Sequence, residues 1–287
     1  MEHVNSYYAA SANQHAAWPQ LTDDIRCDVC VVGGGYTGLS TALFLVEAGF
    51  DVVVLEASRI GFGASGRNGG QIVNSYSRDI GVIESRYGQD TARMLGSMMF
   101  EGGDIIRSRI EQYQIDCDFR PGGIFAALNK RQLEELKSQK SDWERYGHQN
   151  LELLDAGQVR EEIDTQAYVG ALLDHRGGHI HPLNLALGEA EAIRKLGGRI
   201  FEQSAAVDIQ HGDPATVVTA RGRVEANFVV MAGNAYLGNL VPKLAAKAMP
   251  CGSQVITTEP LSEAQASRLI PNNYCVEDCN YLLDYFR

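Results

Sequence analysis

A glycine turn is the part of the sequence whose residues are best placed to do chemistry. Gly33, Gly35 and Gly38 have the spacing G-x-G-x-x-G, directly after an apolar run. Glycines in these places allow a tight turn, let a pyrophosphate approach the backbone, and let the next helix pack close to the strand. The first turn of that helix, with Tyr36 and Thr37, would offer N–H groups and the positive end of its dipole to phosphates.

An acid completes this pattern. A second apolar run over residues 52–55 leads into Glu56 and Ala57. A carboxylate roughly 20 residues beyond the glycine turn binds the ribose hydroxyls of an adenosine. The glycine motif alone is a weak signal, but the full order of strand, turn, helix, strand and acid is a strong one. The sequence therefore predicts a site for NAD or FAD.

A glycine-rich loop follows, where an NAD domain would normally continue with another strand and helix. Five glycines lie between Gly61 and Gly70, among Ile60, Phe62 and Arg67. Glycines at this density let backbone approach a flat or charged group closely. A flexible linker is the alternative, but linkers are not usually interrupted by large apolar residues and an arginine. The loop therefore favours FAD over NAD.

The residues from Glu56 to Gln71 resemble a known family. Their pattern, Glu-x-x-x-x-Gly-x-Gly-Ala-Ser-Gly-Arg-Asn-Gly-Gly-Gln, is similar to that of the FAD-dependent amine and amino-acid oxidoreductases of the D-amino-acid oxidase type. Residues 6–12, 177–184, 229–235 and 250–254 share the resemblance, which covers essentially the whole chain. It implies oxidation of a primary amine by FAD and oxygen, giving an aldehyde, ammonia and hydrogen peroxide. The implied substrate is γ-glutamylputrescine, with another amine or an amino acid as the alternative.

The motifs and the resemblance together give a set of expected cofactor-binding residues. They are Gly33, Gly35, Tyr36, Thr37, Gly38, Glu56, Ala57, Arg59, Ser65, Gly66, Arg67, Gly69, Gly70, Gln71, Val207, Ala232 and Gly233. For Val207 a plain core valine is an equal alternative. For Ala232 and Gly233 the alternative is an ordinary strand end. Arg67 is expected to touch the cofactor or to steer its loop, against a surface ion pair. No catalytic side chain is named, because a neutral amine needs no obligatory base.

The resemblance also bears on the end of the chain. Relatives in the family continue well past the position of Arg287. We therefore expect a C-terminally truncated member with an incomplete substrate domain, impaired flavin retention and little turnover. A non-catalytic FAD-binding fragment is the corresponding alternative.

Composition and net charge restrict the classes of binding partner and the cellular location that we expect. The net charge of −11 disfavours nucleic acid and anionic membrane surfaces, and it is compatible with a cationic amine. No Lys or Arg precedes Arg26, so a basic leader is not expected. The uncharged run 29–46 is too rich in glycine for a membrane helix. We expect a cytoplasmic protein that meets no membrane; its oligomeric state is unknown.

A metal site is not expected. His175, His179 and His181 lie close in sequence, but only the last two would share a strand face. A metal needs three or four ligands with an orienting shell, so structural histidines are favoured.

The remaining patterns predict the elements that position these residues. Apolar spacing indicates helices over 89–114 and 130–146 and strands over 199–203, 215–220 and 227–232, with a final alternating strand that places Tyr281 and Tyr285 on one face. The expected fold is α/β: a Rossmann-like FAD-binding domain interleaved with a β-rich α+β substrate domain. We expect an arm over 1–24, the FAD-binding domain over 25–115 and 151–242, and the substrate domain over 116–150 and 243–287.

Overall fold

The computed structural model describes residues 1–76 and 78–287, and the chain divides into two compact units. The first unit comprises residues 1–68, 113–117 and 182–256, and the second comprises 69–112, 118–181 and 257–287. The chain thus leaves and re-enters each unit, as an interleaved fold requires. The boundaries differ from those expected, because 69–112 and 151–181 fall in the second unit and 243–256 in the first. The pairing of residues 170–179 with 120–127 explains part of this difference.

The first unit is built on a six-stranded sheet in the order β7-β2-β1-β10-β9-β8. The four strands β7, β2, β1 and β10 run parallel, and β9 and β8 extend the sheet as antiparallel strands. Their bounds are β1 Ile25–Val32, β2 Val52–Leu55, β7 Arg199–Phe201, β8 Asp208–Gln210, β9 Ala215–Val218 and β10 Arg223–Met231. The near-continuous valines of β1 and β2 suit strands that are buried on both faces.

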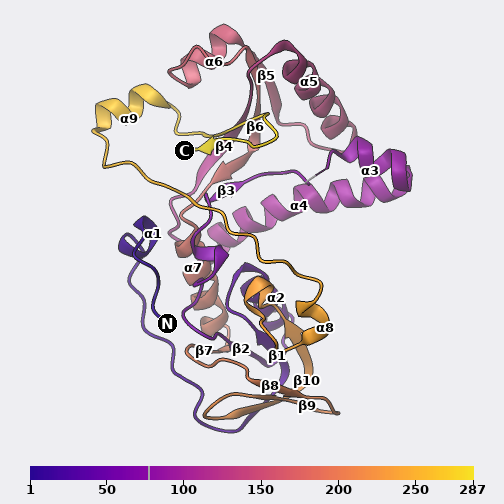
Figure 1. Ribbon diagram of the computed structural model, residues 1–287, viewed down its shortest axis with the longest axis vertical. Helices are drawn as coiled ribbons and strands as arrows, with labels where there is room; N and C mark the ends of the chain where they lie inside the picture. The colour runs from indigo at the N-terminus through magenta and orange to yellow at the C-terminus, as the bar shows by residue number, and fades with distance from the viewer. Residues whose placement is uncertain (77) are drawn as a thin grey trace. The chain divides into compact units, whose positions relative to one another are not determined.

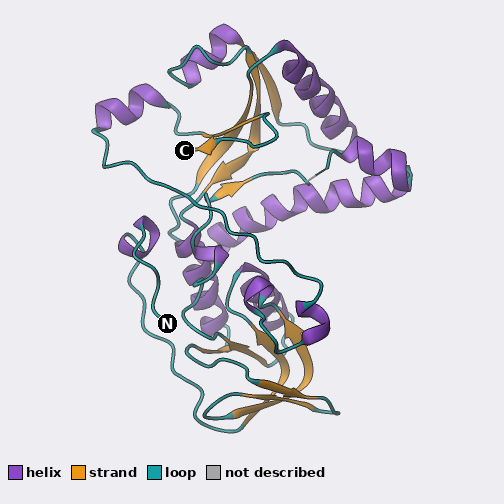
Figure 2. Cartoon of the chain, viewed as in Figure 1, coloured by secondary structure: helices purple, strands orange, loops and turns teal. Residues whose placement is uncertain are grey.

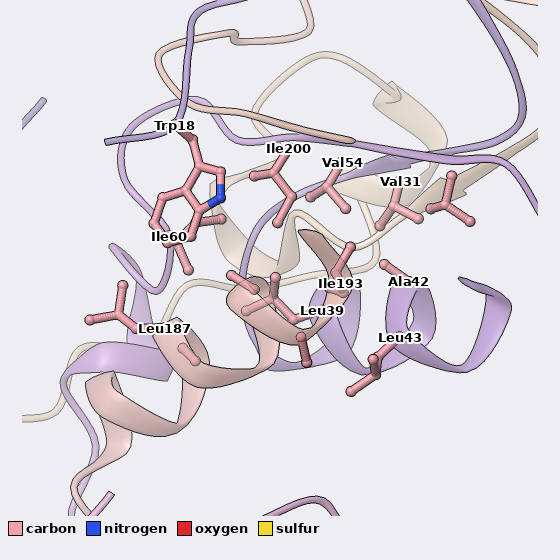
Figure 3. Packing of buried hydrophobic residues seen from close by; sticks show 14 of the residues in the cluster. Trp18, Val31, Leu39, Ala42, Leu43, Val54, Ile60, Leu187, Ile193 and Ile200 are labelled. Atoms are coloured by element: carbon pink, nitrogen blue, oxygen red, sulfur yellow. The ribbon is translucent and has the colours of Figure 1, made fainter. Parts of the chain in front are cut away.

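Two helices cover one face of this sheet. They are α2 (Tyr36–Glu47) and α7 (Pro182–Lys195), which pack against each other. Figure 3 shows Leu39 and Leu43 of α2 and Ile193 of α7 in one apolar cluster with valines of the sheet. The N-terminal stretch adds a short helix, α1 (Tyr7–Ala10), and contributes buried Tyr8, Trp18 and Leu21 to the core. The other short helices are η1 Ala64–Gly66, η2 Asn234–Tyr236 and α8 Pro242–Ala245.

The second unit has its own sheet in the order β12-β11-β4-β6-β3, with β5 also paired to β6. Helices α4 and α5 are its longest (Figures 1 and 2). The strands are β3 Gln71–Ile72, β4 Arg120–Ala127, β5 Leu151–Asp155, β6 Gly170–His179, β11 Cys275–Asp278 and β12 Tyr285–Phe286. The helices are α3 Ile80–Tyr87, α4 Gln89–Tyr113, α5 Lys130–Arg145, α6 Ala156–Glu162 and α9 Glu263–Leu269.

Alternation along the central strands of the second unit produces two apolar layers. Phe125 of β4 and Leu172 of β6 pack on Phe100, Leu136 and Trp143 of the helices. The intervening residues of the same strands join a separate cluster, made of Ile124, Ala126, Leu154, Val159, Ile163, Ala171, Leu173 and Val276. Helices therefore cover one face of a β-rich unit, as predicted for an α+β fold.

The helix predictions are confirmed, whereas the prediction of a final strand that includes Tyr281 is wrong. The expected helices over 89–114 and 130–146 are α4 and α5 to within one residue at each end. The last strand holds only Tyr285 and Phe286, and Tyr281 is fully exposed in a turn. Alternation misled because residues 279–284 connect β11 to β12, and a connection has no fixed side-chain period.

Candidate cofactor site

The first unit contains a cavity of about 320 Å³ at the carboxyl ends of β1, β2 and β10. Ligands of open α/β sheets bind at this edge. Most of the walls come from the glycine turn, the end of β2, the loop after it and the segment after β10. The lining residues are Met1, Val32, Gly33, Gly35, Tyr36, Thr37, Leu55, Glu56, Ala57, Ser58, Phe62, Gly63, Ala64, Ser65, Ala205, Ala206, Ala232, Gly233, Asn234, Tyr236, Leu237 and Leu240.

Two of the motif glycines are required by backbone packing. Gly33 has φ of +119°, and a Cβ on it would lie 2.5 Å from the carbonyl oxygen of Ala232. A Cβ on Gly38 would lie 1.9 Å from the carbonyl oxygen of Gly33. Backbone atoms cannot rotate away as a side chain can, so both positions exclude any larger residue. The predicted reasons, a tight turn and close helix packing, are confirmed for these two.

Gly35 has a reason that the sequence did not suggest. A Cβ there would lie 2.8 Å from the hydroxyl oxygen of Ser65. That hydroxyl accepts a hydrogen bond from the N–H of Tyr36 at 3.0 Å, which ties the glycine-rich loop to the start of α2. Gly35 is the N-cap residue and has no side chain of its own to cap the helix. The first turn of α2 therefore directs its N-terminal dipole at the cavity.

Glu56 lies where the motif predicts, at the end of β2. Its Oε2 accepts from the N–H of Gly34 at 2.7 Å, and its Oε1 accepts from the N–H of Ser58 at 2.8 Å. Burial raises the pKa of Glu56, and these two N–H groups act in the opposite direction. Each carboxylate oxygen has a second lone pair, so the group can still accept from ligand hydroxyls.

The two arginines of the loop brace it from outside the cavity. Arg59 donates to Glu202 at 2.7 Å, and Glu202 also accepts from the N–H of Ile60 at 2.7 Å. Arg67 donates to the carbonyl oxygen of Phe62 at 2.8 Å, and its guanidinium lies 4.8 Å from the centre of the Phe62 ring. Neither arginine is among the residues that line the cavity, and the roles expected of Arg59 and Arg67 toward the cofactor stay predictions.

The structure places Val207 beside the cavity wall and not in it. Its side chain is 59% exposed, and its N–H donates to the carbonyl oxygen of Val218 at 2.8 Å. The core-valine alternative is therefore wrong. Ala205 and Ala206, just before it, line the cavity instead.

Several wall residues have no motif that could have revealed them. Phe62 and Tyr236 contribute aromatic surface, and Asn234 contributes a polar edge at φ of +45°. Ala232 and Gly233, which the sequence did single out, follow β10 and line the cavity. Because Ala232 touches Gly33 across the sheet, its position could be argued only from the strand order.

Gly69, Gly70 and Gln71 belong to the second unit. Gly70 has φ of +78°, and a Cβ on Gly69 would lie 2.6 Å from the ring of Tyr285. A larger residue at 69 would therefore require the Tyr285 ring to move. Gln71 starts β3, and its side chain donates to the carbonyl oxygen of Val276 at 3.1 Å.

The histidines expected to be structural occupy different environments. His179 and His181 are buried, and His175 is exposed beside Glu152 at 3.4 Å. Burial lowers the pKa of both His179 and His181. Among the residues that the structure describes, no three His, Cys, Asp or Glu side chains are grouped as a metal would need.

Within residues 1–76 and 78–287, no helix combines the length and the apolar character that spanning a membrane requires.

The chain belongs to the FAD dependent oxidoreductase family, whose model matches residues 28–287. It is 70% identical over 287 residues to gamma-glutamylputrescine oxidoreductase of Escherichia coli (strain K12), covering 100% of this chain and 67% of that protein. It is 43% identical to the probable oxidoreductase OrdL of Haemophilus influenzae, over 100% of this chain and 68% of that protein. The chain thus spans about two thirds of the length of these curated relatives.

Solved structures show the same fold at low identity. L-proline dehydrogenase from P. horikoshii superposes with a TM-score of 0.69 at 18% identity, covering 92% of this chain and 67% of that one. Glycine oxidase from Geobacillus kaustophilus superposes with a TM-score of 0.59 at 23% identity, covering 76% of this chain and 58% of that one. These likenesses confirm the predicted α/β fold class.

Proposed function

We propose that the chain binds FAD with its adenosine and pyrophosphate in the cavity of the first unit. The cavity suits these groups: the turn at Gly33 and Gly35 carries no Cβ, the start of α2 supplies a positive dipole, and Glu56 offers acceptors to ribose hydroxyls. We further propose Thr37, Ser65 and the neighbouring lining residues as contacts of the pyrophosphate.

We propose Gly69, Gly70 and Gln71 as the backbone that faces the flavin ring. These residues follow the loop of the first unit directly in sequence, and the positive φ of Gly70 turns the chain into β3. When bound, FAD supplies the acceptor for the two electrons of the substrate. The contribution of the protein is to orient the amine, exclude water and stabilise developing charge.

The proposed reaction is the oxidation of γ-glutamylputrescine at the terminal primary amine of its putrescine group. R–CH2–NH2 + O2 + H2O gives R–CHO + NH3 + H2O2, so the carbon loses two electrons and oxygen gains them. The observation that carries this substrate is the 70% identity, along the full chain, to gamma-glutamylputrescine oxidoreductase. The amine reacts as the neutral base, because an ammonium nitrogen has no lone pair to assist C–H cleavage.

The test is a visible absorption spectrum of the purified chain, repeated anaerobically after addition of γ-glutamylputrescine. We expect an oxidised flavin spectrum that bleaches with this amine and does not bleach with putrescine, sarcosine or glycine. Air should then restore the colour with release of peroxide. Bleaching by one of the other amines instead would replace the proposed substrate, and bound flavin that no amine bleaches would contradict an oxidase.

A substitution at Glu56 tests the cofactor site separately. Glu56→Ala removes both acceptors at the end of β2, and we expect FAD affinity to fall roughly ten- to a hundredfold, as for a lost charge-assisted hydrogen bond. Glu225→Gln is the matched control, because Glu225 forms an exposed ion pair with Arg26. Fluorescence titration with FAD gives both affinities, and equal values for the two variants would contradict the ribose assignment.

A further inference from the structure

A chain of hydrogen bonds in the second unit links a buried histidine to the backbone of Gly69. His179, at the end of β6, places Nε2 at 2.7 Å from the carbonyl oxygen of Asn273. Its Nδ1 lies 3.1 Å from Nη1 of Arg287. The Nε–H of Arg287 donates to the carbonyl oxygen of Gly69 at 2.9 Å.

The two partners fix the protonation of His179. A carbonyl oxygen can only accept, so Nε2 carries the proton and donates to Asn273. A guanidinium can only donate, so Nδ1 is the acceptor for Arg287. His179 is therefore a neutral imidazole with its proton on Nε2. Burial lowers the pKa of His179, and the charge of Arg287 lowers it further.

The same backbone stretch is anchored at its neighbouring residues. The carbonyl oxygen of Gly70 accepts from the N–H of Ile180 at 2.8 Å, and Gln71 pairs with His179 in the sheet. The ring of Tyr285 packs directly on Gly69, where a side chain would clash. These contacts hold the backbone of Gly70 and Gln71 in place. The hydrogen bond from Arg287 to the carbonyl oxygen of Gly69 fixes the peptide plane that follows Gly69.

We propose that His179 is a positioning residue for the flavin-facing backbone. As a neutral acceptor it orients Arg287, and Arg287 holds the carbonyl of Gly69 so that the Gly69–Gln71 backbone keeps one conformation. This role rests on the proposed function only in its last step, the presence of a flavin against that backbone. The hydrogen bonds from Arg287 to His179 and to Gly69, which we call the relay, lie within the second unit.

The first test reads the tautomer without any cofactor. Long-range 1H–15N NMR correlations of the 15N-histidine-labelled chain should show His179 at neutral pH with Nε2 protonated and Nδ1 unprotonated. Chemical shifts of Arg287→Lys should show the Nδ1 environment of His179 changed. An imidazolium, or a proton on Nδ1, would overturn the relay even if every variant fails to fold.

The second test separates the two bonds of His179. In His179→Asn the amide oxygen can take the place of Nδ1 and keep the acceptor for Arg287. In His179→Gln the amide nitrogen can take the place of Nε2 and keep the donor to Asn273. We expect hydrogen exchange at residues 69–71 to accelerate roughly tenfold or more in His179→Gln, as for a lost hydrogen bond to a charged group. The Asn variant and the exposed control His175→Gln should match wild type.

The outcomes of the exchange test are distinct. Acceleration in His179→Asn alone would overturn the relay by making the bond to Asn273 the one that matters. Equal acceleration in both variants would also overturn it, because packing of the ring and not its bond to Arg287 would then hold the segment. Unchanged exchange in all variants would overturn it as well. With FAD loaded, His179→Gln should shift the flavin reduction potential and the Asn variant should not. A wild-type chain that fails to hold FAD would count against the proposed function, while tautomer and exchange still decide the relay.

Discussion

At the scale of single residues, His148 and Asp174 form a fully buried hydrogen-bonded pair. The His148 Nε2 and the Asp174 Oδ1 lie 2.7 Å apart, with side-chain exposures of 0% and 1%. Asn74 donates to the other oxygen at 2.9 Å, and the rings of Phe100 and Trp143 enclose the imidazole. Burial by itself raises the pKa of Asp174, but the hydrogen bonds from His148 and Asn74 outweigh it and hold the pKa below the ordinary value.

This pair makes the second unit sensitive to acid. Because the folded pKa of Asp174 is lowered, its contribution is complete above the unfolded value of about 4 and is lost as the pH falls through the folded value. Asp174→Asn weakens the hydrogen bonds that the carboxylate accepts from His148, Asn74 and the N–H of Arg176, and we expect a loss of about 1.5–3 kcal/mol near neutral pH. Urea unfolding in a Trp18→Phe background, where fluorescence reports on Trp143, measures both effects between acid and neutral pH. The exposed control Asp208→Asn should keep the wild-type acid profile, and the same profile in Asp174→Asn would contradict the assignment.

Four glycines of the motif and loop differ in whether their contact partners are near or far in the sequence. Gly33 and Gly38 are glycines for the reasons that the motif predicts, because the atoms they avoid belong to the same strand–turn–helix unit or to the strand beside it. At Gly35 and Gly69 a Cβ would meet the side chains of Ser65 and Tyr285. These partners come from distant segments of the chain that no local pattern specifies.

At the scale of elements, helix α2 depends on its close approach to the glycine turn. A methyl group on Gly38 would overlap the backbone of Gly33, so Gly38→Ala should cost about 3 kcal/mol through overpacking and should disrupt the cavity. Gly102 in α4 has open space around it, so Gly102→Ala should stabilise by about 0.5–1 kcal/mol through helix propensity. Thermal unfolding of the two variants should give shifts of opposite sign, and a neutral Gly38→Ala would refute the packing argument.

The shortest strands, at the edges of the two sheets, could not be predicted from the sequence. Helices α4 and α5 were predicted almost to the residue because a sustained helical period over many residues is a strong local signal. The short strands β8 and β12 have three and two residues, and they exist through their pairing with β9 and β11. Such strands have too few residues for a period, so tertiary pairing determines them.

At the scale of the whole molecule, the two-unit division lets the proposed site for the adenosine and pyrophosphate of FAD be tested within the first unit. If FAD binds in the cavity of the first unit, saturation at 100 times the Kd should stabilise the folded site by about 2.7 kcal/mol. Hydrogen exchange should then slow in β1, α2 and β2, which surround the glycine turn. Strand β5, which pairs with residues 170–174 of β6, serves as the internal reference. Slowing confined to β4 and β6 would contradict a cofactor site in the first unit.

The sequence by itself determined the family, the FAD cofactor, the fold class and the glycine turn with Glu56. The glycine turn and Glu56 belong to one contiguous strand–turn–helix–strand unit, and the family, cofactor and fold class follow from short motifs spread along the chain. Only the tertiary structure decided which segments share a unit, which side chains Gly35 and Gly69 face, and that Arg59 and Arg67 brace the loop from outside the cavity. It also placed Ala205 and Ala206 in the wall and joined His179 to Gly69 through Arg287. Those contacts join residues far apart in the chain, and strand order and register, which no local pattern specifies, bring them together.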